Sequence, residues 1–161
     1  THQPAGGLDI NCLATGQIYA MQDCRLNNAG TMTVLVSSEG AATPGYSLYV
    51  QRSNAPVGCP TLASGVAVSA TVAAGGVDCY RLPTDSGAVT MQTTTVGVGR
   101  VQVLTYKTTG YRSCGTAATW WLLQSVTWTC PAATAGTYGG ATYVLPAPGS
   151  PATYQLTATL P

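Results

Sequence analysis

Residues 153–160 read T-Y-Q-L-T-A-T-L, an unbroken alternation of polar and apolar side chains. A period of two places Tyr154, Leu156 and Ala158 on one face of an extended strand, with polar residues on the other. Residues 66–72 (V-A-V-S-A-T-V) and 45–51 (G-Y-S-L-Y-V-Q) repeat this pattern. The alternation therefore predicts antiparallel strands with one buried and one exposed face.

The remainder of the chain continues the β pattern. Helix signals are nearly absent, because Gly or Pro interrupts almost every window long enough for three helical turns. Several short strands separated by Gly, Pro and Asp turns are typical of a sandwich or jelly roll. We therefore expect an all-β fold of antiparallel β-sandwich or jelly-roll modules, stapled by disulfides. Further strands are expected at 32–37, 88–95, 99–106 and 122–129.

Composition excludes several classes of function. Charged residues make up 7% of the 161 residues and the net charge is +1, so the chain carries no basic field to attract nucleic acid. No apolar run approaches the ~18 residues of a membrane-spanning helix, and we expect no membrane insertion. Six cysteines without a CxxC pair indicate three disulfides rather than a metal or redox site. The expected location is extracellular or at a cell surface, in an oxidising environment.

An internal repeat organises the chain. The sequence from Cys24 reads C-R-L-N-N-A-G-T-M, and the sequence from Cys130 reads C-P-A-A-T-A-G-T-Y. Each copy then leads to a tyrosine-headed strand, Y-S-L-Y-V from Tyr46 and Y-Q-L-T-A from Tyr154. The first copy lacks the residues that precede the second. We expect a half β-module at 1–53, equivalent to the second half of the repeat, and a complete sandwich at 54–161.

The repeat also suggests how the cysteines pair. Cys12 precedes Cys24 in the first copy as Cys114 precedes Cys130 in the second. We expect equivalent Cys12–Cys24 and Cys114–Cys130 bridges, which leaves Cys59–Cys79 by elimination. Six cysteines allow fifteen connectivities, so the repeat, not the spacing, carries this prediction.

Several short motifs lie between residues 60 and 161. They are Leu62-Ala63-Ser64-Gly65, Gly76-Val77-Asp78-Cys79-Tyr80, Ser86-Gly87, Ala135-Gly136-Thr137-Tyr138 and Tyr154-Gln155-Leu156. These motifs resemble the bacterial pre-peptidase C-terminal domain, and their second half is echoed at 12–51. The resemblance implies a small β-sandwich appended to secreted proteins, in about one and a half tandem copies, and brings no catalytic residues to carry over. The cysteines depart from the usual pattern of that family.

Catalytic chemistry is not supported by the residues present. The one histidine, His2, lies near the start of the chain, and the carboxylates are scattered. General acid–base and nucleophilic catalysis both need groups that this chain lacks. Asp78 and Asp85 are expected to satisfy local turn amides rather than bind Ca²⁺, because strong calcium sites gather several carboxylates. We expect no enzyme activity, no cofactor and no metal.

The tryptophans raise a weaker hypothesis of glycan binding. Trp120 and Trp121 are candidates for stacking on a neutral sugar, but adjacent residues on a strand point to opposite faces. At least one of them is therefore expected in the core. Trp128 shares an apolar face with Cys130 and is also expected in the core.

Three hypotheses about function follow from the half-module. An incomplete sandwich exposes unpaired strand edges, and strands from a second copy would complete it, giving a head-to-tail homopolymer. This favours a structural subunit of an extracellular filament or surface assembly, with Thr1–Ile10 or Thr153–Leu160 as the donated strand. Alternatively, the chain is a non-catalytic, glycan-binding accessory domain of a larger secreted hydrolase. In the third case the half-module folds onto the complete one within a monomer.

Overall fold

The computed structural model describes residues 33–37, 45–52, 56–82, 88–97, 99–106, 112–115, 125–130, 141–147 and 149–160, with only the backbone for 112–115 and 141. The chain divides into two units, Thr1–Ser47 and Leu48–Pro161. The described residues of the second unit form eight strands in two antiparallel four-stranded sheets. Within the described residues, no helix is long and apolar enough to cross a membrane.

The first sheet has the strand order β1-β8-β3-β6. It consists of β1 (Val68–Val72), β8 (Ala152–Thr159), β3 (Val89–Val96) and β6 (Ser125–Cys130). β8 lies inside this sheet, with β1 along one edge and β3 along the other. The strand with the clearest alternation in the sequence is therefore a central strand.

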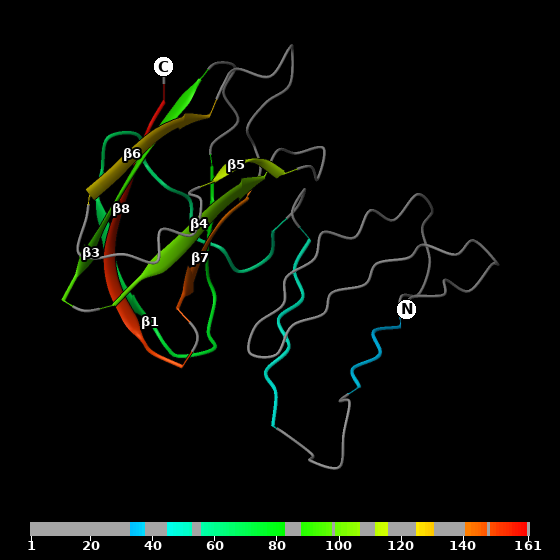
Figure 1. Ribbon diagram of the computed structural model, residues 1–161. Coiled ribbons are helices and arrows are strands. Elements are labelled where there is room, and N and C mark those ends of the chain that lie inside the picture. Colours follow the sequence, from blue (N-terminus) through cyan, green and yellow to red (C-terminus); the bar gives the residue numbers. More distant parts are fainter. Residues whose placement is uncertain are drawn as a thin grey trace. The chain divides into compact units, whose positions relative to one another are not determined.

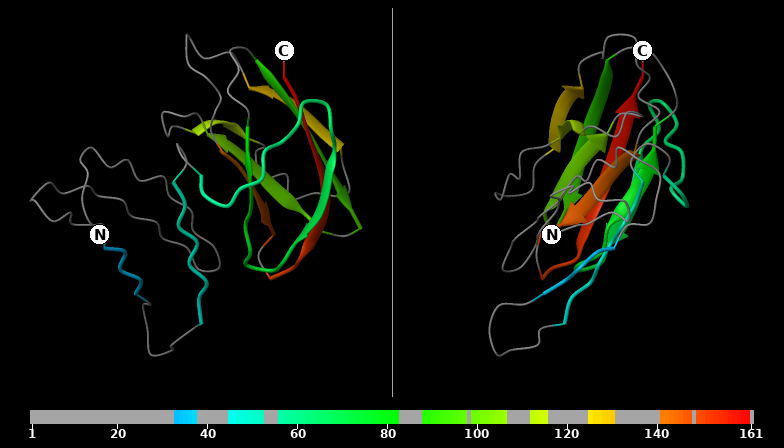
Figure 2. Two further views of the ribbon diagram at one scale, coloured as in Figure 1. Left: turned by 180° about the vertical axis from the view of Figure 1, so that it is seen from behind. Right: turned by 90° about the vertical axis from the view of Figure 1, so that its right-hand side faces the viewer.

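The second sheet has the order β2-β7-β4-β5. It consists of β2 (Asp78–Arg81), β7 (Ala141–Pro146), β4 (Val101–Tyr106) and β5 (Arg112–Gly115). The two sheets form separate layers that face each other (Figure 1). Figure 2 shows the same layers from two further directions. The fold is a β-sandwich, as the sequence predicts.

The core between the sheets is formed by alternate residues of each strand. In β8, Ala152, Tyr154, Leu156 and Ala158 are buried, whereas Thr153 and Gln155 are exposed. Trp128 packs against this core, as its position beside Cys130 predicts. The buried Thr105 and Thr142 hydroxyls lie 3.2 Å apart. The other core residues are Leu62, Val72, Tyr80, Leu82, Val89, Met91, Val103, Cys130 and Val144.

The second sheet is buried on its outer face as well. Leu104, Tyr106, Tyr143 and Leu145 form a second apolar cluster, and each alternates with a residue of the main core. The rings of Tyr106 and Tyr143 meet edge to face, with centroids 5.4 Å apart. β4 and β7 therefore bury consecutive side chains, as strands covered on both faces do.

Two strand predictions are wrong. Residues 33–37 and 45–52 carry alternating or β-branched side chains, but neither segment forms a strand. A strand requires hydrogen bonds to a neighbour, and neither segment pairs with another described segment. In contrast, β2, β5 and β7 are present although the sequence analysis did not expect them.

Candidate functional site

The structure places some of the predicted site residues. Cys59 and Cys79 form a disulfide, which is the pair expected by elimination. Cys130 is also disulfide-bonded; the side chain of Cys114 lies outside the described residues. Also outside them are Cys12, Cys24, Thr1–Ile10, Trp120 and Trp121. Their pairing and binding roles stay predictions, as do the half-module and its boundary at residue 53.

The C-terminal candidate for a donated strand is already paired within its own sandwich. Thr153–Leu160 coincides with β8, which is hydrogen-bonded along both edges to strands of the same chain. Its apolar residues already fill the core of its own sandwich. We therefore do not propose this segment as the donated strand.

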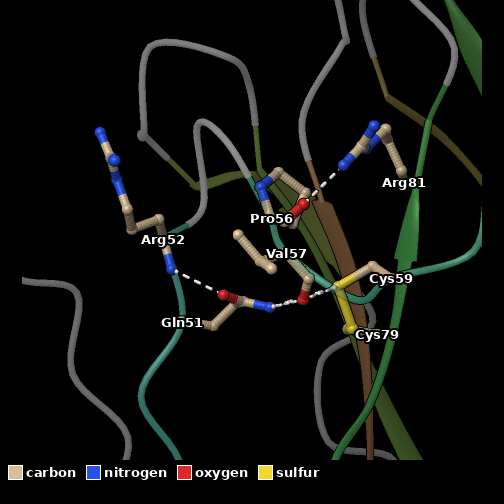
Figure 3. Close-up of a disulfide and its surroundings, with 7 residues drawn as sticks. All are labelled: Gln51, Arg52, Pro56, Val57, Cys59, Cys79 and Arg81. Atoms are coloured by element: carbon tan, nitrogen blue, oxygen red, sulfur yellow. Dashed lines mark hydrogen bonds between the residues drawn. A yellow bond between two sulfur atoms is a disulfide. The ribbon is translucent and has the colours of Figure 1, made fainter.

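A tether, defined as the described residues 51–52 and 56–62, is fixed to β2 by the disulfide (Figure 3). Arg81 is held three times: its Nη2 donates to the Pro56 carbonyl at 2.6 Å, its N–H donates to Pro60, and its carbonyl accepts from the Leu62 N–H. Thr61 also forms a parallel bridge with Arg81. The tether thus occupies hydrogen-bonding groups on the edge of β2.

The start of the tether is fixed by a second set of contacts. The Gln51 side chain donates to the Val57 carbonyl at 2.8 Å and lies 3.3 Å from the Cys59 sulfur (Figure 3). Two residues earlier, the ring of Tyr49 meets Tyr143 edge to face at 6.2 Å. Tyr49 thereby contacts the outer face of the second sheet, and Gln51 contacts residues further along the tether.

The two sheets are joined inside the core by a chain of hydroxyls. The Tyr154 hydroxyl, on β8, donates to Asp78 Oδ2 on β2 at 2.7 Å. Its oxygen lies 2.6 Å from the Tyr80 hydroxyl. Because the Tyr154 proton is directed at the carboxylate, Tyr80 must be the donor of the second bond. Asp78 is therefore a partner of a core tyrosine, not of a turn as the sequence analysis expected.

The environment of this chain favours the neutral tyrosines. Burial raises the pKa of Tyr154 far above its usual range, and the hydrogen bonds with Tyr80 and Asp78 raise it further. Burial also raises the pKa of Tyr80, partly opposed by its bond to Tyr154. Both tyrosine side chains are buried. Sequence reasoning noted Asp78, Tyr80 and Tyr154 in separate motifs but not their contact, which depends on how the sheets face each other.

Exposed apolar side chains gather on two described segments. Val34, Leu35 and Val36 are 44%, 73% and 48% exposed. In the second segment, Tyr46, Leu48 and Val50, which share one face of an extended chain, are 68%, 56% and 58% exposed. Consecutive exposed apolar side chains of this kind mark interaction surfaces in soluble proteins.

The four edge strands differ in how they are protected. β2 carries Asp78 and Arg81 and is joined by the tether. β5 contains Arg112, and its pairing with β4 is irregular at Thr105/Tyr106. Charges, bulges and covering segments are the devices that prevent edge-to-edge pairing. The second sheet therefore has two protected edges.

The first sheet has less protection. β6 carries no charge, but it lies against β5 and ends in the disulfide-bonded Cys130. β1 has no protecting residue in its sequence, because residues 61–77 contain no charged residue and no proline. Among the described residues β1 pairs with β8 alone. Its free edge is the least protected of the four.

No protein-family model matches the chain, and no curated protein matches its sequence. The resemblance to the pre-peptidase C-terminal domain therefore stays a prediction. Within the described part of the chain, no group of three or more His, Cys, Asp or Glu side chains could hold a metal ion.

Proposed function

We propose that the protein is a secreted, non-catalytic structural subunit of an extracellular filament or surface assembly, built by β-strand complementation between copies. The observation that carries this proposal is the coexistence of a sandwich with two apolar, strand-like segments at 33–37 and 45–50. Exposing these side chains to water is unfavourable by about 25 cal/mol per Å². Pairing with a neighbouring copy would bury them and satisfy their backbone groups.

The covalent chemistry supports the extracellular setting. The disulfide between Cys59 and Cys79 indicates an oxidising environment. With 7% charged residues and a net charge of +1, the surface relies on Thr, Ser, Gln and Asn for its hydration. A chain with so little net charge has weak electrostatic repulsion between copies, which favours association over dispersal.

Assembly state is the decisive measurement. The disulfide-intact chain should form polymers by negative-stain electron microscopy and sediment far above its subunit mass of 16.4 kDa. Disulfide-intact material that remains a monodisperse monomer at high concentration would remove the filament proposal. In that case the accessory-domain hypothesis would be tested next, with a glycan array and variants of Trp120 and Trp121.

A further inference from the structure

We propose that the free edge of β1 in one copy receives residues Gly45–Val50 of a second copy as an additional antiparallel strand. This inference rests on the proposed function and names the two surfaces that meet. The acceptor is β1 together with the residues just before it, and the donor is a described segment of the same chain.

The acceptor is an edge whose apolar row is only partly covered. Val66, Val68, Ala70 and Val72 share the inward side of the strand. Val72 is buried, Val68 and Ala70 are half-buried against the core, and Val66 is 55% exposed. The Gly65 N–H donates to the Ala158 carbonyl at 2.8 Å, so this row begins beside β8 before β1 itself. A further strand on this edge would cover Val66, Val68 and Ala70.

The donor has the matching pattern. Tyr46, Leu48 and Val50 recur at every second residue, and all three are more than half exposed. The side chains that anchor this segment, Tyr49 and Gln51, lie on the other face or beyond its end. The contacts of Tyr49 and Gln51 restrict the segment, which lowers the entropy lost when it pairs.

The internal repeat explains why these two surfaces fit. Tyr46 and Leu48 correspond in the repeat to Tyr154 and Leu156 of β8. In the structure, Tyr154 lies opposite Ala70 and Leu156 lies opposite Val68. Gly45–Val50 is thus a β8-like segment, and β1 of a second copy carries the residues that pair with such a segment.

The expected register follows from that correspondence. An inward-facing donor residue must lie opposite an inward-facing acceptor residue, since a slip of one residue would turn the apolar face outward. Tyr46 is therefore placed opposite Ala70, Leu48 opposite Val68, and Val50 opposite Val66. Neither segment carries a charged residue, so pairing requires no charge to be buried.

The contact is asymmetric, and its asymmetry provides the test. Each copy would have one donor and one acceptor, so repetition gives an open chain rather than a closed dimer. Leu48→Lys disables the donor and leaves the acceptor; Val68→Lys disables the acceptor and leaves the donor. Val66→Lys is a second acceptor variant at a more exposed position, in case Val68→Lys does not fold. Thr127→Lys places the same charge at an exposed position of β6 and serves as the control.

Sedimentation velocity on the folded variants, checked by circular dichroism, gives distinct outcomes. The wild type and Thr127→Lys should polymerise, while Leu48→Lys and each acceptor variant alone should remain at 16.4 kDa. An equimolar mixture of a donor variant with an acceptor variant should form a species of twice that mass and stop there. The pairing is overturned if both kinds of variant polymerise, or if the mixture stays monomeric. In either case, a wild type that polymerises still supports the proposed function. A wild type that never polymerises overturns both.

Discussion

The side chain of Tyr154 forms hydrogen bonds that connect the two sheets. It is fully buried on β8, and it connects Tyr80 and Asp78 of β2 through one hydroxyl. A bond to a carboxylate is stronger than one between neutral groups. The hydroxyl therefore adds a directional contact between the layers of the sandwich, whereas the apolar contacts around it are not directional.

Replacing Tyr154 by Phe removes this link with little change in volume. We expect the free energy of unfolding to fall by about 1–3 kcal/mol, because the buried Tyr80 hydroxyl loses its acceptor and Asp78 loses its donor. Urea unfolding would measure the change. Thr159→Val, which removes an exposed hydroxyl from the same strand, should change stability by less than about 0.5 kcal/mol. Equal effects of the two substitutions would contradict the role assigned to Tyr154.

The raised pKa of Tyr154 predicts how stability depends on alkaline pH. Above about pH 10 the unfolded chain releases the Tyr154 proton, whereas the folded protein retains it. The unfolded state is then favoured, so stability is lost as the pH rises, by about 1.4 kcal/mol per pH unit for this group. Tyr154→Phe should show a correspondingly shallower decline between about pH 10 and 11. An unchanged slope would mean that Tyr154 ionises as easily in the folded state as in the unfolded chain.

At the scale of elements, one disulfide links the tether covalently to β2. Cys59 and Cys79 are separated by 20 residues, and closing a loop of this length contributes about 3 kcal/mol in the chain-entropy model. The double variant Cys59→Ala/Cys79→Ala should lose about this much free energy of unfolding in urea. The loss should accompany increased proteolysis within residues 51–62, since Gln51 and Arg81 then hold the tether alone. A variant of unchanged stability would show that the hydrogen bonds suffice.

The strands with the clearest alternation in the sequence, β8 and β1, have one face exposed to solvent. β8 and β1 alternate cleanly because one side meets the core and the other meets solvent, and both were expected within two residues of their bounds. β7 was missed for the opposite reason. Tyr143, Val144 and Leu145 are all buried, so the strand shows no period, and Pro146 ends it. Burial of the outer face of the second sheet is a tertiary property that local patterning does not encode.

Periodicity also predicted strands where none forms. Gly45–Gln51 has the alternation of β8, yet an alternating sequence specifies only which side chains would share a face. Whether a strand forms depends on a neighbour, and the neighbours of β8 come from residues 68–72 and 89–96. The Asp78–Tyr80–Tyr154 chain was missed on similar grounds, since its members lie 76 residues apart in sequence and meet only across the two sheets.

At the scale of the whole molecule, the scarcity of charge limits which forces can hold copies together. Six basic and five acidic residues are spread over 161 positions, and none lies between Ser113 and Pro161. Surface ion pairs contribute about 0–1 kcal/mol each even where they are present. Contacts between copies must therefore depend on apolar burial and on backbone hydrogen bonds between strands, neither of which is weakened by ordinary salt.

This reasoning predicts that assembly resists salt. At about 1 M NaCl the Debye length falls to about 3 Å, and interactions between exposed charges are largely screened. Polymers formed at low salt should keep the same sedimentation profile at about 1 M NaCl, because the Gly45–Val50 donor and the residues 61–77 around β1 contain no charge to screen. Urea should dissociate them instead, since it solvates both apolar side chains and peptide groups. Dissolution by salt alone would show that ion pairs carry the contact, and it would direct attention to the few arginines and aspartates rather than to β1.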